Sequence, residues 1–204
     1  RGRILVIGGE APVDRAQLEQ VAKDILPRRI EQRKVYIVED SELNDEFGDD
    51  PFTSPRPDLA MASVFAEGVI FAIFVGHGGG GVWNDGRIDI GEQETRGPLL
   101  GQDGVERLAT EGHMPIVLSM TCFTADFSTH PLGETMLAQG EGPSQGAVAW
   151  WGASGFGWET NDYYMLQKVV RLLVRRADGP IRLGQLLADA KIDYLTGPYD
   201  ALYK

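Results

Sequence analysis

Short apolar runs alternate with segments of helical periodicity along this chain, and this alternation constrains its fold more than any other feature. Runs of this kind are typical of strands that a parallel sheet buries on both faces. They lie at residues 3–8, 34–39, 69–75, 115–120 and 146–150. Helix candidates lie at residues 14–26, 58–66, 104–110, 132–139, 161–176 and 183–195, with Asp14 as an N-cap. The alternation predicts one α/β domain over residues 1–204, with a mostly parallel sheet between two helical layers.

The composition limits the partners that such a domain can bind. The 204 residues carry a net charge of −11. Nucleic acids and anionic membranes are bound through clusters of lysine and arginine, so this charge argues against both. No apolar run approaches the ~18 residues that cross a bilayer. Cys122 is the only cysteine, which excludes an internal disulfide and a cysteine-based zinc site.

A glycine-rich loop, FVGHGGGG at residues 74–81, follows the third predicted strand. Its spacing Gly76-x-Gly78-x-x-Gly81 matches the dinucleotide-binding fingerprint, which needs a helix directly after the glycines. The following residues, VWNDGRIDIGEQETRGP, have no helical period, and the chain has no Gly-Lys-Ser/Thr of a P-loop. Residues 76–97 are therefore expected to form an aperiodic loop, and nucleotide binding is a weak alternative function.

The same loop carries His77, two residues past the end of its predicted strand, and Cys122 lies two residues past the end of the next. Ligands of open parallel sheets bind beyond the carboxyl ends of the strands, and neighbouring strands lie about 4.8 Å apart. If these strands are neighbours, thiol and imidazole share a cleft suited to acyl transfer. The N–H groups of Gly78 and Cys122 would then form an oxyanion hole.

Other interpretations of these residues stay open. A lone cysteine at a strand end is more often a small buried hydrophobic residue, and a histidine in a glycine loop is often incidental. His113 precedes the strand and so lies at the wrong edge of the sheet. His130, eight residues after Cys122 and next to Pro131, is an alternative base.

Four blocks in order resemble the gingipain-like C25 family of cysteine peptidases, in the caspase-like clan. They are IFVGHGGGGVW (73–83), LSMTCFTADF (118–127), PLGETMLAQG (131–140) and GAVAWWGASG (146–155), and LGQLLADAKIDYL (183–195) resembles the family's last helix. The resemblance implies a caspase-like three-layer αβα fold and a cysteine endopeptidase. It assigns the nucleophile to Cys122, the general acid/base to His77, and the oxyanion donors to Gly78 and Cys122.

The resemblance also implies a pocket for the substrate side chain before the cleaved bond, the S1 pocket. Its lining would be Val75, Gly76 and Met120, with Trp150 or Trp151 as a wall. Other side chains near the expected cleft have two interpretations each. Trp83 closes the cleft or packs under the loop, and Glu134 binds a cation or stabilises a helix dipole. Asp85, Asp89 and Asp126 recognise a cationic substrate or are simply solvated.

The expected partners are a peptide or protein substrate and other domains of a longer chain. By the resemblance, this piece lacks an N-terminal subdomain and a C-terminal strand, and a secreted or cell-surface protein is favoured. We expect no cofactor, although the acidic loops leave calcium open without any EF-hand spacing. The alternative function is a catalytically silent caspase-like domain that acts as a binding or secretion scaffold.

Overall fold

The computed structural model describes residues 2–9, 11–37, 57–84, 98–108, 113–138, 146–176 and 179–197. Its centre is a five-stranded sheet in the order β2-β1-β3-β7-β8, and every neighbouring pair of these strands is parallel. The strands are β1 (Arg3–Gly8), β2 (Glu31–Tyr36), β3 (Phe71–Val75), β7 (Ile116–Met120) and β8 (Ala149–Gly152). The predicted α/β fold with a parallel sheet is confirmed.

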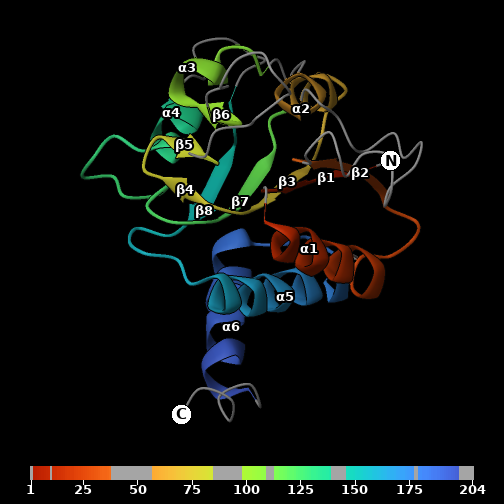
Figure 1. The fold of residues 1–204 in the computed structure, drawn as a ribbon. Helices are drawn as coiled ribbons and strands as arrows, with labels where there is room; N and C mark the ends of the chain where they lie inside the picture. The colour runs from red at the N-terminus through yellow and green to blue at the C-terminus, as the bar shows by residue number, and fades with distance from the viewer. Residues whose placement is uncertain are drawn as a thin grey trace.

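Helices cover both faces of this sheet (Figure 1). On one face lie α1 (Pro12–Asp24), α5 (Glu159–Arg175) and α6 (Leu183–Thr196). On the other lie α2 (Pro57–Ala66), α3 (Gln102–Val105) and α4 (Leu132–Ala138). Each face of the sheet has its own hydrophobic core, and alternate strand residues point into one or the other. Leu5 and Phe74 belong to the core on the α2 side, whereas Val6 and Ile73 belong to the core on the α1 side.

Several predicted boundaries move. The second strand begins at Glu31 rather than residue 34, the last strand spans Ala149–Gly152 rather than 146–150, and α3 begins at Gln102 and ends at Val105. Asp14 is not the N-cap of α1, because Ala11 holds that position and makes no side-chain cap bond. Pro12 begins the helix instead, since its fixed φ suits the first turn. Asp14 itself is buried.

The described part of the loop expected at residues 76–97 is not aperiodic, while residues 85–97 lie outside the described residues. It forms an antiparallel hairpin of β4 (Gly78–Gly79) and β5 (Val82–Trp83), and β5 pairs further with β6 (Leu100–Gly101). Gly80 makes the turn with a φ of +43°, a conformation that glycine adopts without strain. Strand follows these glycines, so the helix that would hold a dinucleotide pyrophosphate is missing from this position. Among the described residues, no helix is long and apolar enough to cross a membrane.

Candidate active site

The register of β3 and β7 brings His77 and Cys122 to one edge of the sheet. Val75 pairs with Met120, and each candidate residue lies two positions further along its chain. The hairpin and the loop after β7 are in close contact, because a Cβ on Gly78 would lie 2.6 Å from Thr121 Oγ1. The His77 side chain is exposed and Cys122 is partly exposed. Both residues therefore lie at an edge of the sheet that solvent can reach.

The hairpin fixes the backbone around His77. Asn84 N–H donates to the His77 carbonyl at 2.8 Å, so the next pair, Gly78 with Trp83, belongs to the non-hydrogen-bonded type. The N–H of Gly78 then points away from β5. Before the histidine, Gly76 packs so closely on Gly9 that a Cβ would lie 2.9 Å from the Gly9 Cα. These contacts hold the backbone on both sides of His77 in place.

A buried chain of hydrogen bonds joins the hairpin to the loop that carries Cys122. Trp83 Nε1 donates to Ser119 Oγ at 2.8 Å, and Ser119 Oγ lies 2.9 Å from Thr124 Oγ1. Trp83 is fully buried and stacks on Phe74 with ring centroids 4.7 Å apart. Trp83 therefore packs under the loop, the second of its two predicted roles.

The loop after β8 holds the sulfur of Cys122. Phe123 N–H donates to the Gly155 carbonyl at 2.9 Å, and Ala125 N–H donates to the Ala153 carbonyl at 3.0 Å. The Gly157 N–H lies 3.4 Å from Cys122 Sγ, and the thiol lies 3.6 Å from the Gly157 carbonyl oxygen. The side chain of the only cysteine thus rests against one backbone residue of this loop.

A cavity of about 350 Å³ opens beside this loop, lined by Ser119, Met120, Trp151, Gly152, Ala153, Ser154, Gly155, Phe156, Asp162, Met165 and Lys191. We call it the β8 pocket. Met120 and Trp151 were predicted to line such a pocket. Val75 is buried in the core, Gly76 packs on Gly9, and Trp150 stacks on Trp83 on the α2 side of the sheet at 5.6 Å. None of these three residues is among those that line the β8 pocket.

Sequence reasoning missed Asp162, an acidic residue of the first turn of α5. Burial raises the pKa of Asp162 to about 6. Among the described residues, no side chain forms a hydrogen bond or ion pair with its carboxyl group. A first-turn acid is common in any helix, so only the position of α5 behind β8 distinguishes Asp162. Applying the strand-end rule to β8 as well as to β3 and β7 would have pointed to this region.

The other candidates lie apart from this pocket. His113 precedes β7 and packs by Gly68, while His130 has a φ of +58° before α4 and its Nδ1 lies 3.0 Å from Glu134 Oε2. Glu134 thus pairs with His130. Asp126 accepts hydrogen bonds from Ser128, whose hydroxyl lowers the pKa of Asp126. Asp85 and Asp89 lie outside the described residues. Within those residues, no three His, Cys, Asp or Glu side chains converge to hold a metal ion.

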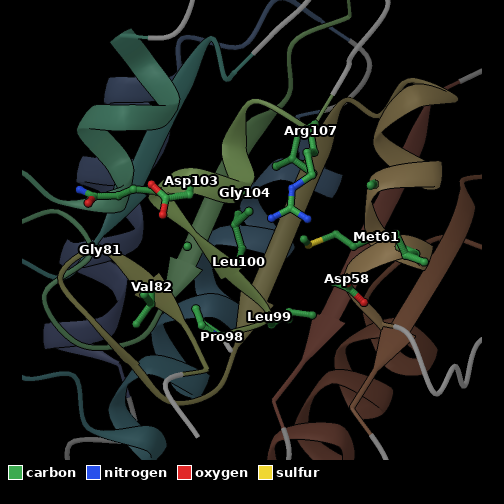
Figure 2. Close-up of a pocket in the computed structure, with 15 residues that line it drawn as sticks. Asp58, Met61, Gly81, Val82, Pro98, Leu99, Leu100, Asp103, Gly104 and Arg107 are labelled. Atoms are coloured by element: carbon green, nitrogen blue, oxygen red, sulfur yellow. The ribbon is translucent and has the colours of Figure 1, made fainter. Parts of the chain in front are cut away.

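A larger cavity of about 540 Å³ lies elsewhere, between α2, α3 and the β5–β6 pair (Figure 2). Figure 2 shows the side chains of Arg107 and Met61 directed into it, with their ends toward each other. Neither His77 nor Cys122 lines this cavity, although Gly81 and Val82 of the hairpin do. Size alone would select this cavity. Neither His77 nor Cys122 lines the β8 pocket either, but that pocket lies next to the nucleophile loop, because Gly155 in its lining accepts the hydrogen bond from the N–H of Phe123, the residue after Cys122.

Comparison with known proteins adds a family and a fold. Residues 1–203 match Peptidase family C25. The crystal structure of the Arg specific cysteine proteinase gingipain R (RgpB) aligns over 100% of this chain and 43% of its own, with a TM-score of 0.67 and 16% identity. A complex of Porphyromonas gingivalis RgpB pro- and mature domains aligns over 95% of this chain and 43% of its own, with a TM-score of 0.61 and 13% identity.

A third structure, of a protease, aligns over 80% of this chain and 31% of its own, with a TM-score of 0.54 and 18% identity. A search of curated proteins found no match. This chain spans less than half the length of the gingipain structures, and at these identities they establish the fold alone. The expected caspase-like fold and the resemblance to C25 peptidases are confirmed. Since residues 1–203 match its pattern, the chain belongs to Peptidase family C25.

Proposed function

We propose that this chain is the catalytic part of a cysteine endopeptidase, with Cys122 as nucleophile and His77 as general acid/base. The observation that carries the proposal is the β3–β7 register, which supports a shared cleft for the two side chains. Membership of Peptidase family C25 agrees with this chemistry. Their resting separation need not be a hydrogen bond, because catalytic contacts often tighten only when substrate binds.

In the proposed reaction, the Cys122 thiolate attacks the peptide carbonyl carbon, forming a C–S bond as the carbonyl electrons move to oxygen. The N–H groups of Gly78 and Cys122 donate to that oxyanion. Imidazolium His77 protonates the leaving amine as the C–N bond breaks. Water then attacks the acyl-enzyme, His77 accepts its proton, and the C–S bond breaks to release the acid and restore the thiolate.

The β8 pocket is proposed as the S1 pocket. Met120 and Trp151 supply apolar walls for an alkyl stem, and Asp162 supplies a carboxyl group that no described cation pairs with. At pH 7, above its pKa of about 6, Asp162 is ionised and complements a guanidinium or ammonium group. The proposed substrates are therefore polypeptides cleaved after a basic residue, in line with the description of gingipain R as an Arg specific cysteine proteinase.

Intact-mass analysis after exposure to peptidyl acyloxymethyl ketones tests this proposal. The panel carries Arg, Lys, Asp, Asn or Leu before the warhead. We expect one adduct, on Cys122, formed fastest with Arg or Lys and absent from Cys122→Ala. Fastest labelling by Leu or Asp would overturn the basic specificity. Failure of every ketone in a folded sample would favour the silent scaffold instead.

A further inference from the structure

Gly157 lies between the sulfur of Cys122 and the carboxyl group of Asp162. On one side, its N–H and carbonyl face the sulfur at 3.4 and 3.6 Å. On the other, a Cβ on Gly157 would lie 2.3 Å from Asp162 Oδ2. One glycine residue therefore separates the proposed nucleophile from a half-buried carboxyl group, and only glycine leaves room for that carboxyl group.

The charge on Asp162 is poorly compensated. The titratable side chains that line the β8 pocket are Asp162 of α5 and Lys191 of α6, and Lys191 is exposed. Asp162 and Lys191 form no ion pair with each other, and burial alone raises the pKa of Asp162. Near neutral pH, the empty pocket holds a carboxylate one residue away from the sulfur. A negative charge at this range opposes the formation of a second one on sulfur.

We propose that a cationic side chain bound beside Asp162 activates Cys122, so that filling the pocket prepares the nucleophile. The inference rests on the proposed function, because it treats the β8 pocket as the substrate pocket. The bound cation cancels the field of the carboxylate, and the Gly157 N–H then stabilises the thiolate without opposition. A peptide with a basic residue at the cleavage site thus raises the reactivity of the group that attacks it.

The test measures alkylation of Cys122 by iodoacetamide across pH, with and without agmatine. Agmatine carries a guanidinium group but no carbonyl that could be attacked. We expect agmatine to speed alkylation of the unmodified chain at pH 7 by roughly three- to tenfold, and to move the pH midpoint of the rate downward. Asp162→Asn should react faster than the unmodified chain without agmatine, and agmatine should not change its rate.

Two matched variants complete the design. Asp103→Asn makes the same charge change on α3, at the larger cavity, and should keep the agmatine response. Gly157→Ala displaces the Asp162 carboxyl group and should lose the response, whereas Gly184→Ala adds a methyl group where nothing lies within 4 Å and should keep it. Circular dichroism checks that each variant is folded.

The coupling is overturned if agmatine protects Cys122, leaves its rate unchanged, or speeds Asp162→Asn equally. Ketone labelling keeps this failure distinct from failure of the proposed function. A ketone adduct on Cys122 without an agmatine response would support the proposed peptidase function and contradict the coupling between Asp162 and Cys122. An agmatine response without an adduct from any ketone would support the coupling between Asp162 and Cys122 and contradict the proposed peptidase function.

Discussion

At Gly78 the candidate site leaves no room for a side chain. A Cβ at this position would lie 2.6 Å from Thr121 Oγ1 and 2.9 Å from the Val82 carbonyl oxygen, which is backbone and cannot rotate away. We expect Gly78→Ala to shift the hairpin and to slow ketone labelling by about 10²-fold, the cost of losing one oxyanion donor. Mass spectrometry of samples quenched at successive times measures the labelling rate. If Gly78→Ala is labelled as fast as the unmodified chain, Gly78 is not an oxyanion donor.

Asp162 gives the stability of the chain a characteristic pH dependence. Its folded-state pKa is raised to about 6 from an ordinary value of 3.8. Between these values the folded state binds the proton more tightly, so this group's stabilising contribution is present at low pH and is lost as pH rises through about 6. The change is at most about 3 kcal/mol.

Urea unfolding of the unmodified chain and of Asp162→Asn, from pH 4 to pH 7, measures the pH dependence that Asp162 gives to the free energy of unfolding. The stability difference between the two should change with pH in that window, in favour of Asp162→Asn as pH rises. A constant difference would mean that the carboxyl group is solvated in the folded state.

At the scale of elements, the Trp83 indole joins the hairpin to the nucleophile loop through Ser119. Trp83→Phe keeps most of the ring packing but removes the N–H, which leaves the buried Ser119 hydroxyl without this donor. We expect a loss of about 1–3 kcal/mol in unfolding free energy, measured in urea. Trp158→Phe, at a side chain 72% exposed, is the control and should change it by less than about 0.5 kcal/mol. If both variants change the unfolding free energy equally, the Trp83–Ser119 hydrogen bond does not stabilise the contact between the hairpin and the nucleophile loop.

The sequence predicted the main strands and helices because their apolar runs are long enough to show a period. Its bounds were poorest where every residue is apolar, as in GAVAWWG, since periodicity cannot then locate the strand or assign Trp150 and Trp151 to opposite faces. The hairpin was missed because its strands have two residues each and its first four residues, 78–81, are all glycine. Tertiary packing on β3, through Phe74 and Trp83, stabilises it instead.

The candidate site was predictable to the extent that strand ends meet at one edge. His77, Gly78 and Cys122 each follow a strand that could be recognised from the sequence, so their proximity needed only the strand order. Asp162 could not be found in this way, because a first-turn carboxylate has the same sequence signature whether it is buried or solvated. Its burial depends on how α5 packs beside β7 and the loop after β8, which local sequence does not encode.

For the molecule as a whole, the proposed chemistry draws every group from the chain itself. Thiolate, imidazole and backbone N–H groups complete the reaction without a metal ion. We therefore expect EDTA to leave the rate of ketone labelling unchanged, with the same sample in added calcium as the control. A loss of labelling in EDTA that calcium restores would show that a bound cation supports the site.

The comparison of His77→Ala with His130→Ala decides whether His77 is the general acid/base of the Cys122 site. Both variants remove one imidazole, but His130 pairs with Glu134 before α4 while His77 extends from the strand beside Cys122. The measurement is the rate at which an Arg ketone labels Cys122. If His77 is the general acid/base, His77→Ala slows labelling by at least about 10²-fold, and His130→Ala changes the labelling rate by less than about threefold. Unchanged labelling of His77→Ala, or a greater loss in His130→Ala, would contradict that role.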